Sequence, residues 1–250
     1  MPFDRLFRRY FGPEDTSSKT NMTEWQQACT ARAEKYGYSK VPAAVVYTAF
    51  AEIVKPSTFG FAPVKNGLVA AKVSDDIFQV IEFRSGKGDI YSFRWGVSLS
   101  YVPHDWCGKC TFHRTLKSVH LDLFEDAGEF LIKDPYSAEG WQYYTDSGHG
   151  ETCMREDLAR ACGNLKPIIL HWFDSTSNLD GILNRAAVQV NHLWQGFRHH
   201  PDPKLVYAFT LARLGRVSEG KTALEELIES NRETYGSIEL RCALDKITKT

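Results

Sequence analysis

Apolar and polar residues alternate most regularly between Ile90 and Val102. Large apolar side chains occupy every second position, and mostly small or polar ones lie between them: Tyr91, Phe93, Trp95, Val97, Leu99 and Tyr101 against Ile90, Ser92, Arg94, Gly96, Ser98 and Ser100. Because successive side chains of a strand point to opposite faces, this segment predicts a strand with one buried face and one solvent-facing face that carries Arg94. A strand that is buried on one face only is typical of an antiparallel sheet.

Two shorter runs before this strand predict further strands, over Gly67–Val73 and Ile77–Arg84. The residues between the runs are mainly Ser, Asp, Gly and Lys, which suit tight turns, so we expect the three strands to form an antiparallel meander. We expect another strand over Ser118–Phe124 and, after it, a turn-rich insertion over Asp134–Gly150.

Two helices are predicted before the sheet. The first begins at Thr23, whose side chain can cap it, and ends near Gly37. The second, more apolar helix covers Val41–Val54, and we expect Pro56 to stop it.

Helical spacing returns after the insertion. It covers Arg155–Ala161 and then continues from Leu165. Asp174 or Ser175 is the expected cap of the helix that follows.

The segment Asp202–Ser230 contains two apolar helical faces with a break at Gly215, which predicts an αα-hairpin. Its small residues resemble a single tetratricopeptide-type unit. One such unit cannot bury its apolar face alone, so we expect a helical cap on the same domain, with a repeat array as the alternative.

The first dozen residues place Phe3, Leu6, Phe7 and Tyr10 at helical spacing among arginines, and a polar connector follows. The chain thus divides into three predicted parts. Residues 1–21 form an amphipathic helix and a linker, and residues 22–183 form an α+β domain with a mainly antiparallel sheet flanked by helices. Residues 184–250 form a helical extension packed on that domain.

Composition then narrows the function classes. The 30 basic and 31 acidic side chains give a net charge of −1, so no overall field attracts nucleic acid or anionic lipid. No segment approaches the roughly 20 apolar residues of a membrane span, and the N-terminus lacks the apolar core and cleavage site of a signal peptide. Six scattered cysteines in 250 residues do not suggest a disulfide scaffold, so we expect reduced thiols and a cytoplasmic location.

The order of several segments carries a family resemblance. After the first helices come the strands IFQVIEFRSGKG and YSFRWGVSLSY, a Trp-bearing insertion and the segment HWFDSTSNLDGIL. Over Val41–Leu183 this order resembles a bacterial family named domain of unknown function 4304. The resemblance implies an α+β domain with a mainly antiparallel sheet, and it implies neither a substrate nor catalytic residues.

One run of the sequence contains residues that bind metals or react as thiols. His104, Cys107, Cys110 and His113 follow one another at intervals of three, and zinc in proteins prefers thiolate and imidazole ligands. On a regular strand or helix these residues would not converge, so a zinc site would require a tight turn around Gly108.

The same run also resembles the Trp-Cys-Gly-x-Cys active site of thioredoxin-like proteins, where the first thiol is the nucleophile. An antiparallel meander precedes it here, instead of the parallel βαβ unit of those proteins. The third interpretation is structural: the cysteine pair lies in a loop at the end of a strand, packed with Trp106 and Phe112.

Two further clusters have both a chemical and a structural interpretation. His120 and Asp122 lie two apart and would share a face of a strand, as an acid–base pair requires, but carboxylates just after a strand are usually solvated. The segment His171–Asp174 combines a histidine, two aromatic residues and a carboxylate, and such aromatic residues usually belong to a core.

We therefore expect a bacterial, non-catalytic module of the regulatory or immunity type that binds another macromolecule. We expect a protein partner and no cofactor, with binding through Arg94 and the aromatic insertion residues Trp141 and Tyr143. The alternative is a metal-binding or dithiol redox protein that uses Cys107 and Cys110. The sequence leaves the oligomeric state open.

Overall fold

The computed structural model describes residues 27, 30–57, 60–65, 67–86, 89–106, 109–112, 115–127, 140–191, 202–230 and 237–247. The N-terminal helix and linker predicted for residues 1–21 lie outside these residues.

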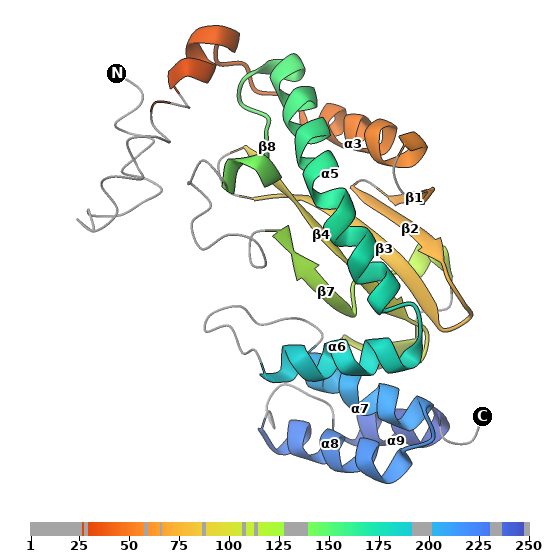
Figure 1. The fold of residues 1–250 in the computed structure, drawn as a ribbon. Helices are drawn as coiled ribbons and strands as arrows, with labels where there is room; N and C mark the ends of the chain where they lie inside the picture. Colours follow the sequence, from red (N-terminus) through yellow and green to blue (C-terminus); the bar gives the residue numbers. More distant parts are fainter. Residues whose placement is uncertain are drawn as a thin grey trace.

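The predicted α+β class is confirmed: helices flank an antiparallel sheet and form the C-terminal part of the chain (Figure 1). The strands are β1 (Ala62–Lys65), β2 (Leu68–Lys72), β3 (Ile77–Ser85), β4 (Ile90–Leu99), β5 (Pro103–Trp106), β6 (Lys109–Phe112), β7 (Leu123–Asp126) and β8 (Thr145–Asp146). The α-helices with defined bounds are α3 (Ala43–Ser57), α5 (Gly150–Ser175), α6 (Leu179–Asn191), α7 (Pro203–Arg213), α8 (Val217–Ser230) and α9 (Ser237–Ile247), and residues 30–36 are also helical. Short 3₁₀ helices cover η2 (Leu116–Ser118) and η3 (Gly140–Tyr143).

The main sheet has the strand order β1-β2-β3-β4-β7, and β8 pairs with one end of β4. All of its neighbouring pairs are antiparallel, as the meander pattern predicts. The ladder between β3 and β4 runs from the pair Ile77 and Leu99 to the pair Ser85 and Tyr91. β4 therefore lies inside the sheet, between β3 and β7.

Helices α3 and α5 pack against one face of the sheet, and Figure 1 shows α5 running across it. The main apolar cluster lies on this face and includes Phe93, Trp95 and Val97 of β4 together with Leu158 and Leu165 of α5. These three β4 residues belong to the face that the alternation predicts to be buried.

The prediction that the other face of β4 meets solvent is wrong. Ser92, Gly96 and Ser98 are buried, and Arg94 is mostly buried. A second apolar cluster includes Val119 and Leu121, which lie between η2 and β7, together with the strand residues Leu68, Ala70, Phe78, Val80 and Phe124. A Cβ atom at Gly96 would collide with the carbonyl oxygen of Leu123. The backbone of β7 can therefore lie this close to β4 only because position 96 has no side chain.

Several predicted boundaries differ from the structure. The expected strand Ser118–Phe124 is replaced by η2 and by β7, which begins only at Leu123. Pro56 does not stop α3, which continues to Ser57.

On the C-terminal side of the insertion, one helix of 26 residues, α5, replaces the two helical stretches and contains Pro167. Asp174 and Ser175 are not caps but belong to this helix. Asn178 precedes α6, and its side chain accepts a hydrogen bond from the Gly181 N–H at 2.9 Å.

The C-terminal part contains the predicted αα-hairpin, formed by α7 and α8 with Gly215 at φ +81° between them. Apolar residues of these helices belong to the same cluster as those of the sheet. The hydroxyl groups of Tyr101, just after β4, and Thr210 of α7 lie 3.1 Å apart. On the side of α8 that meets α9, Lys221 pairs with Asp245 and Arg241 pairs with Glu225.

Candidate binding groove between α3 and the first two strands

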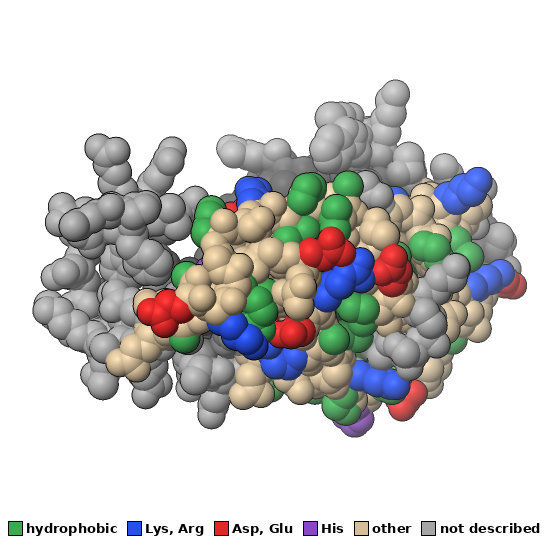
Figure 2. Space-filling view, turned by 90° about the horizontal axis from the view of Figure 1, so that it is seen from above, with side chains coloured by type: hydrophobic (Ala, Val, Ile, Leu, Met, Phe, Trp, Pro, Cys, Tyr) green, Lys and Arg blue, Asp and Glu red, His purple; other side chains and the backbone are tan. Residues whose placement is uncertain are grey.

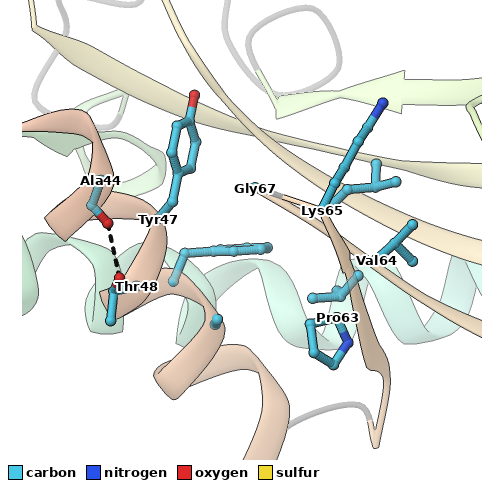
Figure 3. Close-up of a pocket in the computed structure, with 11 residues that line it drawn as sticks. Ala44, Tyr47, Thr48, Pro63, Val64, Lys65 and Gly67 are labelled. Atoms are coloured by element: carbon cyan, nitrogen blue, oxygen red, sulfur yellow. Dashed lines mark hydrogen bonds between the residues drawn. The ribbon is translucent and has the colours of Figure 1, made fainter. Parts of the chain in front are cut away.

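An open groove of about 440 Å³ lies between α3 and the edge of the sheet formed by β1 and β2 (Figure 3). Its lining is mainly apolar: Ala44, Tyr47, Thr48, Phe50, Ala51, Pro63, Val64, Lys65, Gly67, Leu68 and Val69. Sites for small molecules usually have volumes of about 300–1,000 Å³ and combine an apolar lining with a few polar groups. The groove is therefore the described cavity best suited to hold a ligand.

Aromatic rings support the groove from below. The rings of Phe50 and Phe83 stack at 5.0 Å with an angle of 4° between their planes. Phe83 also packs against Tyr91 and Phe93, and Tyr91 contacts the Tyr47 ring edge to face at 5.9 Å. Aromatic pairs of this kind add about 0.5–1.5 kcal/mol each beyond their buried area, so this part of the lining is rigid.

Gly67 determines the position of the Tyr47 ring. Its φ of +70° lies in the region that glycine adopts readily. A Cβ atom at this position would lie 2.8 Å from the ring of Tyr47 and would also collide with the carbonyl oxygen of Phe83. The turn between β1 and β2 therefore requires glycine here, and its missing side chain leaves room for the ring.

Polar groups are few in the groove. Figure 3 shows the Tyr47 hydroxyl and the Lys65 ammonium at the same end of the groove, on opposite walls. The Thr48 hydroxyl donates a hydrogen bond of 2.9 Å to the carbonyl oxygen of Ala44 within α3, so that hydroxyl is already satisfied. Lys65 is the single charged residue of the lining, which contains no carboxylate.

The edge strand beside the groove is poorly suited to pairing with another strand. β1 has four residues, one of them is Pro63, and its register with β2 shifts between Pro63 and Lys65. Short length, proline, irregular register and lysine are features by which natural sheets protect an edge from a further strand. A ligand in the groove would therefore contact side chains rather than pair with the backbone of β1.

Of the predicted binding residues, Arg94 is placed differently from the expectation. Its side chain is 16% exposed, and its Nε donates a hydrogen bond of 2.7 Å to Asp126 Oδ2. The same oxygen lies 3.3 Å from the guanidinium of Arg84, and the Arg94 guanidinium lies 4.9 Å from the centre of the Phe124 ring. Arg94 thus fastens β7 to β4, and the expectation that it faces solvent is wrong.

The two aromatic residues predicted for the insertion lie in η3, away from the groove. Tyr143 is half-buried and packs against the main apolar cluster. The side chain of Trp141 lies outside the described residues. Tyr143 is not among the residues that line the groove.

The cysteine run forms a β-hairpin of β5 and β6. The register pairs His104 with Thr111, Asp105 with Cys110 and Trp106 with Lys109. Phe112 at the end of β6 packs against the main apolar cluster, and Cys110 belongs to β6 rather than to the loop that the structural interpretation expects.

The four predicted metal ligands are His104, Cys107, Cys110 and His113, and all four side chains lie outside the described residues. Among the side chains that the structure describes, no group of three or more His, Cys, Asp and Glu could hold a metal ion. The zinc and dithiol interpretations therefore stay predictions.

A buried charge cluster, missed by the sequence analysis, joins the helical residues 30–36 to α5. The Asp157 carboxylate contacts the guanidinium of Arg32 through both oxygens and that of Arg160 at 2.6 Å. Asp146 of β8 holds Gly148 N–H and His149 Nδ1 at 2.7 and 2.6 Å. Burial alone would lower the pKa of Arg32, but its bonds to Asp157 raise it overall, so the Arg32 guanidinium stays charged.

Cys153 lies next to this cluster and is buried. Burial raises the pKa of its thiol to about 11, with a further contribution from the negative charge of Asp157. Because the thiolate is the reactive form of cysteine, this residue is not a nucleophile at neutral pH. The cluster therefore resembles a structural clamp more than a catalytic site.

His120 and Asp122 lie together, as their spacing suggests. His120 Nε2 is 2.7 Å from Asp122 Oδ1, and the other Asp122 oxygen accepts a hydrogen bond of 2.6 Å from the Leu99 N–H. Asp122 is buried, so it is not a solvated turn residue as its sequence position suggests. Its carboxylate accepts the hydrogen bond of the last N–H group of β4. Of the predicted segment His171–Asp174, Trp172 and Phe173 belong to the main apolar cluster.

Charged side chains of both signs are mixed on the face seen in Figure 2, among apolar ones. Among the described ion pairs, that of Arg155 with Glu52 connects α5 to α3, and that of Arg155 with Glu151 lies within α5. Within the described part of the chain, no helix is long and apolar enough to cross a membrane.

Comparison of the chain with models of protein families, with curated proteins and with solved structures finds no match. The resemblance to the domain of unknown function 4304 family thus stays a prediction.

Proposed function

We propose that this protein is a non-catalytic binding protein and that the groove between α3 and β1–β2 holds the apolar part of a ligand. The groove itself carries the proposal, because it combines an apolar lining over a rigid aromatic layer with two polar groups at one end. The described clusters of titratable residues support it indirectly. The carboxylates of Asp122, Asp126 and Asp157 each bind groups of the protein itself.

The bacterial origin, the cytoplasmic location and a protein partner, all expected from the sequence, remain part of this proposal. If the partner protein also used the groove, it would have to insert a side chain there, because β1 is a protected edge. A role in regulation or immunity is compatible with such a contact.

A neutral, apolar fluorescent dye such as Nile red tests the proposal. We expect one dye molecule to bind per chain in the native protein, with a blue shift of its emission. Ala51→Trp should fill the groove and abolish this binding, because Ala51 is a small residue of its lining. The matched control is Ala159→Trp on the exposed side of α5.

Equal dye binding by the two tryptophan variants would show that the groove is not the site. Thermal melting of each variant shows whether it is folded. If Ala51→Trp does not fold, Thr48→Trp replaces it, since Thr48 is an exposed residue of the same wall.

A further inference from the structure

Deepening the proposed function, on which this inference rests, we infer that the natural occupant of the groove is a free amphipathic carboxylate of the fatty-acid class. Its carboxylate would lie at Lys65 and Tyr47, and its hydrocarbon chain would cover the apolar lining toward Phe50 and Val69.

The charge of the groove indicates the sign of the ligand. Lys65 is exposed, and within the described residues no carboxylate lies within 4 Å of its ammonium group. Most other lysine and arginine side chains around the main sheet that the structure describes in full have an acidic partner, for example Lys72 with Asp75 and Lys40 with Asp89. An occupant with a negative group would give Lys65 the partner that its own chain does not provide.

The second polar group suggests which anion. The Tyr47 hydroxyl lies at the same end of the groove as the Lys65 ammonium, and it makes no hydrogen bond within the described residues. A carboxylate has two oxygens that accept hydrogen bonds, so it can be held by an ammonium from one wall and a phenol from the other. A purely hydrocarbon ligand would leave both groups unused, and the Lys65 ammonium would repel a cationic ligand.

The rest of the ligand must be apolar and must not require backbone pairing. A peptide in the groove would place amide groups against Val64, Leu68 and Ala51, and unpaired amides are costly in apolar surroundings. The protected edge of β1 offers these amides few partners. A hydrocarbon chain has no such groups, so it fits the lining without this penalty.

Isothermal titration calorimetry with octanoate, decanoate and decan-1-ol tests the inference on the full chain. Two further methylenes in the groove should tighten binding by between about threefold and fifteenfold from octanoate to decanoate, the upper value corresponding to complete burial. Lys65→Gln should weaken decanoate binding about fivefold, the effect of losing one exposed ion pair, and leave decan-1-ol unchanged. Lys72→Gln, on the neighbouring strand and outside the groove, is the matched control.

The outcomes separate the two proposals. If decan-1-ol binds as tightly as decanoate and Lys65→Gln changes neither, the groove holds apolar groups but the carboxylate inference is overturned. If the groove accepts only an apolar side chain of a partner protein, the affinity will depend neither on the chain length of the carboxylate nor on Lys65→Gln. This result also overturns the inference. If Ala51→Trp leaves decanoate binding unchanged, the ligand lies elsewhere and the proposed function fails with it.

Discussion

Replacement of Asp157 by asparagine should destabilise the protein more than other changes on the same helix. The side chain is 1% exposed, and its carboxylate meets the guanidinium groups of Arg32 and Arg160. It also accepts a hydrogen bond of 3.3 Å from the backbone N–H of Asp146. Asparagine keeps the size of the side chain but removes the negative charge, so the buried Arg32 loses its main counter-charge.

The expected loss is about 3 kcal/mol. Breaking a buried ion pair by removing one partner costs about 3–5 kcal/mol. The lower end applies because the Arg160 side chain is 35% exposed and can be hydrated, and because Arg32 keeps Asp146 at 3.6 Å. For a protein of this size, about 3 kcal/mol corresponds to a fall in melting temperature of about 6–12 °C.

Thermal unfolding followed by circular dichroism measures this shift. The control is Asp174→Asn, also on α5 but exposed, which should change stability by less than about 0.5 kcal/mol. The double variant Arg32→Met, Asp157→Asn should lose less than the sum of the single variants, because no guanidinium is left without its carboxylate. A melting temperature of Asp157→Asn within about 2 °C of the original protein would refute the idea that this cluster clamps residues 30–36 to α5.

Three further outcomes are expected. Trp95→Ala should cost about 3–5 kcal/mol of folding stability because Trp95 is fully buried. Arg94→Ala should cost about 1–3 kcal/mol because Asp126 would lose a charged partner. Urea unfolding of both variants measures these losses, and a loss below about 0.5 kcal/mol for Arg94→Ala would contradict the second value. In peptide mapping after brief alkylation at pH 7.5, Cys242 should be labelled in the folded protein, whereas Cys153, whose pKa burial raises to about 11, should be labelled only after unfolding. Burial also raises the pKa of Tyr101, so this residue contributes stability that is complete below about pH 10 and is lost as the pH rises further. Tyr101→Phe should cost about 1 kcal/mol at pH 7 but make the alkaline loss of stability shallower. An unchanged slope of stability against pH in the alkaline range would contradict this.

The pattern along the chain predicts elements better than it predicts what covers them. The period of two in β3 and β4 identifies both strands, because half of their side chains must be apolar to form a core. The small residues Gly96 and Ser98 are also buried, because the segment from η2 to β7 folds over them. A small residue beneath a close neighbour and a small residue in solvent look the same in a single sequence.

The same limit applies to the candidate site. The apolar side of α3 is evident in the sequence, but β1 is a four-residue strand with a proline, which gives no period to detect. The groove exists only where these two elements meet. The charge cluster was missed because Arg32 and Asp157 lie 125 residues apart, and nothing in the spacing of either residue indicates the other.

The shared core of the sheet and the C-terminal helices has a consequence for synthesis of the chain on the ribosome. Tyr101 lies just after β4, and the hydroxyl that meets its own belongs to Thr210, 109 residues later. At about 5–20 residues per second, that partner is polymerised on the order of ten seconds after Tyr101. During this interval the end of the sheet that α7 later covers has an incomplete apolar core, so the nascent chain depends on rapid arrival of its last helices, or on a chaperone, to avoid aggregation.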